Sequence, residues 1–212
     1  MKKANNRGFT LIEMLVVIGI IAILVGTSIA GFSGISKSAE KAKCQELVAN
    51  AATALTALFQ EEGCWPKKLA AEGKTDGRLD EKVCVALAKS RYFSLSYDAQ
   101  TMKLTGHDRF GILTPWGATA VKRIGVKADL STKVNSLSTV EDHVLYYALD
   151  LDGDGVIKGA NVGGESVDVR ATAIVWSIGK SGGNKGKPWP YKTGLKKDDI
   201  YSWTPAQTKD VK

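Results

Sequence analysis

The stretch Arg7–Gly26, RGFTLIEMLVVIGIIAILVG, combines a long apolar run with a single carboxylate, Glu13. The run starts at Phe9 and exceeds the roughly 20 residues that cross a bilayer as a helix, whereas the apolar core of a secretory signal has only about 7–15. Lysines and an arginine in residues 1–8 place that end in the cytoplasm by the positive-inside rule. The sequence therefore predicts one transmembrane helix over residues 9–32 and a large extracytoplasmic domain after it.

Glu13 is unexpected in such a helix, because a carboxylate in hydrocarbon costs several kcal/mol, and less near a helix end. An ionisable residue inside a membrane segment indicates a functional role. The alternative is that Glu13 lies among the lipid headgroups and has no role. These residues, taken alone, leave both interpretations open.

The same stretch resembles the class III signal of type IV pilins and of type II secretion pseudopilins. The shared features are a short basic leader ending in Gly8, Phe9 directly after it, and Glu13 at the fifth position of the mature chain. The resemblance implies that a prepilin peptidase cleaves between Gly8 and Phe9 and N-methylates Phe9. It also implies that Glu13 pairs with the terminal amine of a neighbouring subunit. Many members of the family have a proline where this chain has Ala30.

Residues 33–62 continue the helix as an amphipathic segment. They are strong helix formers without proline, and Gly63 and Pro66 end the pattern. A helix from Phe9 to Glu62 would be about 80 Å long at 1.5 Å per residue, too long to be buried in one small domain. Its N-terminal half must then pack on lipid and later on other subunits. One buried face is predicted from apolar residues three and four apart, namely Cys44, Leu47, Val48, Ala51, Leu55, Leu58 and Phe59.

Residues 63–212 are predicted to form a globular domain in the periplasm. Tyr92–Asp98, Asp142–Asp150 and Val169–Gly179 have the composition of strands, and residues 151–166 form a loop or hairpin connection between the last two. A long helix followed by strands predicts an α+β fold with an antiparallel sheet on the helix. The resemblance to pilins implies the same arrangement. Leu113–Val121, LTPWGATAV, resembles a turn of major type II secretion pseudopilins, and Lys196–Trp203 resembles their closing segment.

Two groups of residues are candidate calcium sites. Asp150, Asp152 and Asp154 alternate ahead of Gly155, as at the start of an EF-hand loop, although its twelfth position is Asn161 rather than glutamate. The alternative is a solvated turn. A second site follows from the resemblance, which implies that Asp198 and Asp199 bind calcium with backbone carbonyls from Ile178 to Ser181. Its alternative is a helix cap or strand-end turn.

The three cysteines are Cys44, Cys64 and Cys84. Cys44 and Cys64 would lie about 30 Å apart on a helix, too far for a bridge. Cys64 and Cys84 flank a polar segment, and a disulfide between them in an oxidising periplasm would add roughly 3 kcal/mol of stability. The alternative is three buried free thiols, with Cys44 in the core.

Charge and motifs exclude several classes of function. The net charge is +7, but the lysines are scattered, so no specific nucleic-acid partner is expected. The sequence has neither a GxSxG motif nor a P-loop, which argues against an enzyme.

The sequence thus favours a structural subunit of a type II secretion pseudopilus, with calcium as a candidate cofactor. Its expected partners are other pilin-like subunits in a homopolymer, the prepilin peptidase, an inner-membrane assembly platform and membrane lipid. It would cross the bacterial inner membrane once and assemble into a filament in the periplasm or at the cell surface. The alternatives are a type IV pilus subunit, for adhesion, twitching or DNA uptake, and a membrane-anchored periplasmic binding protein.

Overall fold

The structure, a computed structural model, describes residues 10–70, 76–88, 90–98, 100–101, 103–105, 108–125, 129–134, 139–162, 165–180, 199–204 and 206–209. The chain divides into two compact units, residues 1–41 and residues 42–212. The described part of the first unit belongs to helix α1 (Leu11–Glu62) and its capping residue Thr10. No helix in the described ranges is both long enough and apolar enough to count as a membrane span, and this includes the helix expected over residues 9–32.

Helix α1 ends where the sequence predicts. Its last residue is Glu62, and Gly63 follows with a φ of 68°, donating its N–H to the Phe59 carbonyl at 2.8 Å. A residue in this left-handed conformation is a common helix stop, and glycine adopts it without steric cost. The predicted buried face is largely confirmed, because Cys44, Val48, Ala51, Leu55 and Leu58 are all at most 5% exposed.

A four-stranded antiparallel sheet forms the centre of the second unit, in the order β1-β4-β7-β8. The strands are β1 (Asp76–Arg78), β4 (Tyr146–Leu149), β7 (Ala173–Ser177) and β8 (Ile200–Tyr201). In the central pair, Tyr146 lies opposite Trp176 and Leu149 opposite Ala173. Every residue of β4 and β7 is buried. The predicted α+β class with an antiparallel sheet is therefore confirmed, and both central strands lie inside segments predicted as strands.

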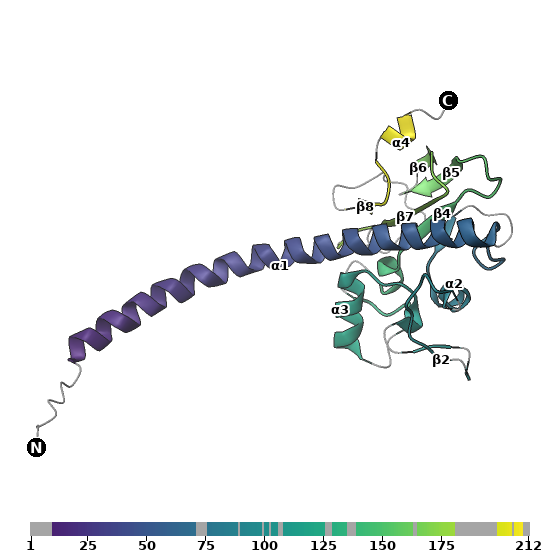
Figure 1. Cartoon of the computed structure of the whole chain (residues 1–212). Coiled ribbons are helices and arrows are strands. Elements are labelled where there is room, and N and C mark those ends of the chain that lie inside the picture. Colours follow the sequence, from purple (N-terminus) through teal and green to yellow (C-terminus); the bar gives the residue numbers. More distant parts are fainter. Residues whose placement is uncertain are drawn as a thin grey trace, which may run out of the picture. The chain divides into compact units, whose positions relative to one another are not determined.

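The sheet has a separate apolar core on each face. Tyr147, Leu149 and Val175 belong to the core that includes the C-terminal part of α1. The alternate residues of the same strands, including Tyr146 and Trp176, pack with the hairpin of β5 (Ile157–Val162) and β6 (Glu165–Val169). Figure 1 shows this hairpin on one side of the C-terminal part of α1 and helices α2 and α3 on the other. Successive side chains of a strand point to opposite faces of the sheet, so the same two strands contribute to both cores.

Two segments differ from their predictions. Only Tyr97–Asp98 of the segment predicted as a strand at Tyr92–Asp98 is extended; it forms β2 and pairs with β3 (Lys103–Leu104). The LTPWGATAV segment is not an isolated turn but the start of helix α3 (Pro115–Ile124). The Thr114 hydroxyl accepts a hydrogen bond from Gly117 N, and proline occupies the first helical position, where its missing N–H costs nothing.

The remaining elements connect these layers. They are α2 (Glu81–Leu87), η2 (Asp108–Phe110), η3 (Glu141–His143) and α4 (Ala206–Lys209). Asp80 caps α2 by accepting a hydrogen bond from Val83 N. Helix α2, η2 and β3 contact one another. Helix α3 supplies Ala118 to a groove beside α1 that is described below.

Candidate functional site

Glu13 closes a capping box at the start of α1. One of its carboxylate oxygens, Oε2, accepts hydrogen bonds from the Thr10 N–H at 2.8 Å and from the Thr10 hydroxyl at 2.7 Å. In return, the Thr10 hydroxyl oxygen accepts from Glu13 N at 3.4 Å. This is the reciprocal arrangement of Thr at the N-cap and Glu three residues later. The sequence interpretation missed this local role, although the T-x-x-E spacing that signals it is present.

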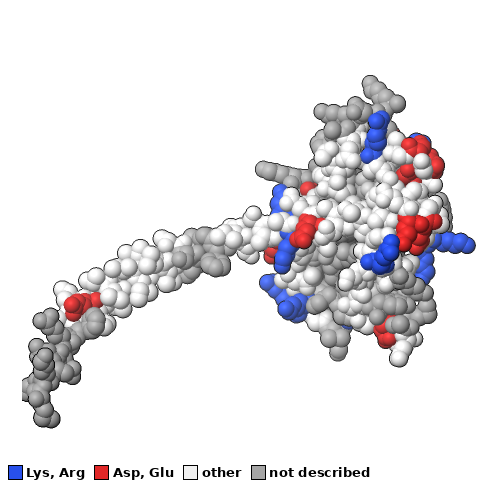
Figure 2. Space-filling view, viewed as in Figure 1, with Lys and Arg blue, Asp and Glu red and all other residues white. Residues whose placement is uncertain are grey.

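The part of α1 next to Glu13 exposes its large apolar side chains. We call residues 11–25 the apolar segment. Exposure there runs from 45% at Val17 to 84% at Leu11, against at most 5% for the buried face further along the helix. Figure 2 shows almost no charged atoms on this part of the molecule. Contiguous exposed apolar surface of this kind indicates contact with another protein or with lipid. The side chains concerned are Leu11, Ile12, Met14, Leu15, Val16, Val17, Ile18, Ile20, Ile21, Ile23, Leu24 and Val25.

The predicted processing positions, Gly8 and Phe9, lie outside the described residues. The structure therefore places only Glu13 of the three residues on which the pilin resemblance depends. Glu13 is in the first turn of α1, three residues after Thr10, and the apolar segment surrounds it.

The first candidate calcium site, the acidic loop Asp150–Gly155, is brought together by the fold. Carboxylate oxygens of Asp150, Asp152 and Asp154 all lie within 4.8 Å of one another. Asp150 is 3% exposed, and its two oxygens accept hydrogen bonds from Gly153 N and Gly155 N, each at 2.8 Å. These bonds fold the chain back on itself directly after β4.

A lysine ammonium already contacts this loop. Lys158 Nζ lies 3.1 Å from Asp152 Oδ2 and also forms an ion pair with Asp154 Oδ2. The hydrogen bonds and charges of this group raise the pKa of Lys158, and the hydrogen bond from Lys158 is the main cause that lowers the pKa of Asp152. Lys158 and Asp152 are therefore both charged at neutral pH.

The donor set of the acidic loop fits calcium poorly. Calcium takes six to eight oxygen ligands, and an EF-hand loop supplies a bidentate glutamate at its twelfth position. The twelfth residue here, Asn161, lies in β5 opposite Ser166. The acidic loop thus offers three carboxylates, two of which already share a lysine.

The second candidate calcium site is only partly described. Asp198 and Ser181 lie outside the described residues. Ile178 is buried just after β7, and Asp199 Oδ2 accepts a hydrogen bond from the Tyr201 hydroxyl at 3.4 Å. Among described residues, the only acidic group of metal-ligating geometry is the acidic loop.

None of the three cysteines forms a disulfide in this structure, and the Cys64–Cys84 bridge stays a prediction. Cys64 is exposed just after α1, whereas Cys84 is completely buried and its sulfur lies 3.2 Å from the Leu79 carbonyl oxygen. Cys44 is a core residue as predicted, and burial raises the pKa of its thiol.

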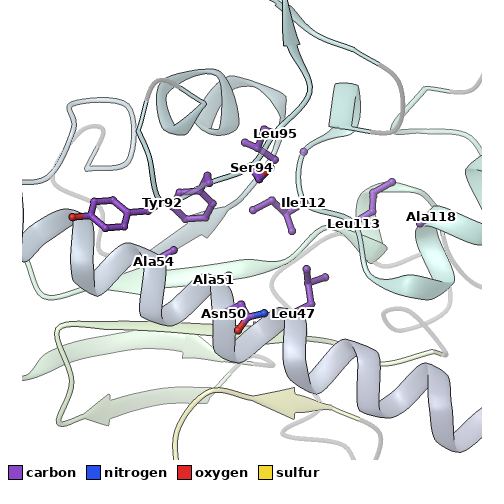
Figure 3. Close-up of a pocket in the computed structure, with 12 residues that line it drawn as sticks. Leu47, Asn50, Ala51, Ala54, Tyr92, Ser94, Leu95, Ile112, Leu113 and Ala118 are labelled. Atoms are coloured by element: carbon purple, nitrogen blue, oxygen red, sulfur yellow. The ribbon is translucent and has the colours of Figure 1, made fainter.

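An apolar groove beside α1 was not predicted from the sequence. It has a volume of about 290 Å³, and α1 supplies Leu47, Asn50, Ala51 and Ala54 to one side. Figure 3 shows Leu95 and Ile112 across from these residues and Ala118 of α3 at the end. The facing residues come from loops far apart in the sequence, so no local pattern could have revealed the groove.

Comparison with known proteins agrees with the geometry at the start of α1. Residues 3–29 match the model of the prokaryotic N-terminal methylation motif. The chain thus carries a type IV pilin-like N-terminal motif. A further similarity is to the fimbrial protein EcpC of Eikenella corrodens, at 28% identity over 109 residues, which cover 50% of this chain and 69% of that protein. No solved structure gives a significant match.

The pilin-like motif includes Gly8, Phe9 and Glu13 in one matched range. A motif of this type indicates export of a membrane-anchored protein. The capping box and the apolar segment therefore lie in the part of the chain that the motif covers, whereas the acidic loop and the groove belong to the second unit.

Proposed function

We propose that this protein is the structural subunit of a pseudopilus that drives type II protein secretion. In this proposal, a prepilin peptidase cleaves between Gly8 and Phe9 and methylates Phe9, and the subunits then polymerise through α1. The observation that carries the proposal is the exposed apolar segment with Glu13 at its start. Water is a poor solvent for a dozen exposed aliphatic side chains, so lipid or other subunits must cover them.

Before polymerisation, membrane lipid covers the apolar segment in this proposal, and an inner-membrane assembly platform delivers subunits to the filament. Residues 63–212 remain on the periplasmic side. Each aliphatic side chain that moves from water into full burial contributes about 1.5–3 kcal/mol. Exchange of lipid for neighbouring helices gains much less, so an additional polar contact is needed to direct docking.

Glu13 supplies that contact in the proposed mechanism. The Thr10 bonds both use Oε2, so Oε1 is the oxygen that we assign to the amine of a neighbouring subunit's Phe9. A charge-assisted hydrogen bond between an ammonium and a carboxylate is about twice as strong as a neutral one, and it is strongest away from water. Docking of a subunit out of register would leave both charges unpaired and is disfavoured.

Two variants separate this role from helix capping. Glu13→Gln keeps an N3 side chain that suits a capping box but removes the charge. Thr10→Ala removes the cap hydroxyl, at a cost of about 1 kcal/mol, but keeps the charge. We expect Gln at position 13 to abolish filaments in sheared-cell fractions and Ala at position 10 to retain them. Mass spectrometry of the membrane-bound subunit should give a methylated Phe9 terminus for the unaltered chain and serves as the processing control.

Normal filaments from Glu13→Gln, with loss of filaments from Thr10→Ala, would show that Glu13 acts only as a helix cap. An unprocessed N-terminus in the unaltered protein would refute the whole proposal. Filament loss with an intact, processed N-terminus in the glutamine variant is the result that the proposal requires.

A type IV pilus subunit is the second candidate, favoured by the similarity to a fimbrial protein. The same N-terminal chemistry serves both kinds of filament, so the discriminating measurement concerns the cell. Deletion of the gene should block secretion of exoproteins and leave surface pili unchanged if the pseudopilus proposal is right. Loss of surface pili with normal secretion would support the pilus instead.

A further inference from the structure

The acidic loop connects three parts of the second unit. The Asp150 carbonyl accepts a hydrogen bond from the Trp65 indole N–H at 2.6 Å, and the Asp150 N–H donates to the Thr172 carbonyl at 2.9 Å. Trp65 in turn stacks on Phe59 of α1, with ring centroids 4.7 Å apart. The backbone at Asp150 thus joins the segment after α1 to one end of the central β4–β7 strand pair, and it must be held in one conformation.

Loops of this composition commonly use a calcium ion for that purpose, because the ion neutralises converging carboxylates. Here the oxygens that would face such an ion, Asp152 Oδ2 and Asp154 Oδ2, contact the same lysine nitrogen. We propose that Lys158 is the built-in cation of the acidic loop, so that the loop closes without calcium and excludes the ion.

The fold fixes Lys158 in this position. Ile157, directly before it, is completely buried and lies opposite Val169 in the β5–β6 hairpin. The strand alternation then directs the next side chain, Lys158, away from the core; it is 58% exposed and lies across the acidic loop. A cation tethered in this way is always present at high local concentration, whereas calcium must come from solution. Binding of calcium would require the ammonium to leave both carboxylates.

Thermal melting of the full chain in detergent, followed by tryptophan fluorescence, tests the proposal. Each protein is melted in calcium chloride and in EDTA at matched ionic strength. Lys158→Met keeps the aliphatic stem and removes the charge, and it is compared with Lys122→Met, which removes an exposed charge from α3. We expect the unaltered protein and Lys122→Met to melt at the same temperature in both buffers.

Lys158→Met should melt lower than the unaltered protein in EDTA and should gain stability in calcium. At a calcium concentration ten times the Kd the gain is about 1.4 kcal/mol, or about 3–6 °C for a chain of this size, from the linkage between ligand binding and unfolding. The double variant Lys158→Met, Asp154→Asn should lose the calcium response, which locates the ion at the acidic loop.

Three results would overturn the proposal. One is a calcium-dependent rise in the melting temperature of the unaltered protein equal to that of Lys158→Met. Another is a Lys158→Met protein that melts like the unaltered protein in both buffers. A third is a Lys158→Met protein that is destabilised but not restored by calcium. The three carboxylates would then not form a cation-binding site, and the Lys158 ammonium would not be acting in place of an ion.

Discussion

Alanine at Gly111 tests a close approach between two backbone segments, the tightest found at any described glycine. Gly111 has a φ of 97°, and a Cβ built there would lie 2.0 Å from the Leu79 carbonyl oxygen and 2.7 Å from Asp80 Cα. These atoms belong to a hydrogen-bonded junction of three segments. Ile112 N donates to Leu79 O at 2.9 Å, Leu79 N donates to Leu145 O at 2.8 Å, and Leu145 N donates to Ile112 O at 2.9 Å.

The expected loss of stability has three parts. Left-handed backbone costs a non-glycine residue about 1–2 kcal/mol. The chain must also move by about 1 Å to bring the new methyl group to 3.0 Å from the Leu79 oxygen, and overpacking of that kind costs about 1–3 kcal/mol. Stretching of the Ile112–Leu79 hydrogen bond adds about 1 kcal/mol. We therefore expect Gly111→Ala to lose about 3–6 kcal/mol of unfolding free energy.

Gly63→Ala is the matched control. Gly63 also has a positive φ, 68°, but nothing lies within 4 Å of its added Cβ. We expect only the conformational cost, about 1–2 kcal/mol. Urea unfolding of both full-length variants in the same detergent, followed by tryptophan fluorescence, gives the comparison. Equal losses within about 0.5 kcal/mol would refute the reasoning, because the Leu79 contact would then contribute nothing.

Two further changes test the core and the pH dependence. Leu55→Ala should lower the free energy of unfolding in urea by about 3 kcal/mol, because the Leu55 side chain of α1 is completely buried in the core that the helix shares with the sheet. Leu47→Ala, at a half-buried position of the same helix, should lower it by less than half as much. Similar losses for the two variants would contradict this packing. Burial lowers the pKa of His143 in the folded protein, and the nearby charge of Asp142 opposes this only in part. As the pH falls, His143 therefore binds a proton in the unfolded chain at a higher pH than in the folded protein. Stability should then decline below about pH 6.5 by at most about 1.4 kcal/mol per pH unit from this residue. Unfolding of His143→Gln between pH 7.5 and 5.5 should show a shallower decline, and an identical slope would exclude His143 as the cause.

The sequence predicts the elements that depend on local pattern. The end of α1 at Gly63 and its buried face follow from helix-stop residues and from spacings of three and four. The central strands β4 and β7 follow from their β-branched and aromatic composition. By contrast, β1 is Asp-Gly-Arg and β8 has two residues, so both are strands only because β4 and β7 provide hydrogen-bonding partners.

Other features needed a partner that no local pattern identifies. Helix α3 is an exception, because Thr114 and Pro115 carry a local N-cap signal that was not used in the sequence prediction. Lys158 reaches the acidic loop because two glycines reverse the chain between Asp152 and β5. The EF-hand pattern of the carboxylates was recognised in the sequence, whereas the cation that satisfies them was not, since it depends on the hairpin.

The apolar segment and the buried face of α1 use the same residue types for different partners. The sheet covers the helix from Cys44 onward, whereas exposed apolar side chains lie between Leu11 and Val25 and again at Ile35. Exposed lysines at positions 37, 41 and 43 separate the two stretches. A lysine ammonium is costly to bury in lipid or in a bundle of helices, so these lysines limit how far neighbouring subunits can cover the helix. The helix from Leu11 to Ile35 is about 37 Å long, from 25 residues at 1.5 Å each. Contacts between subunits of the proposed filament therefore concentrate on this length of helix, with the capping box of Thr10 and Glu13 at one end and the first lysine just beyond the other.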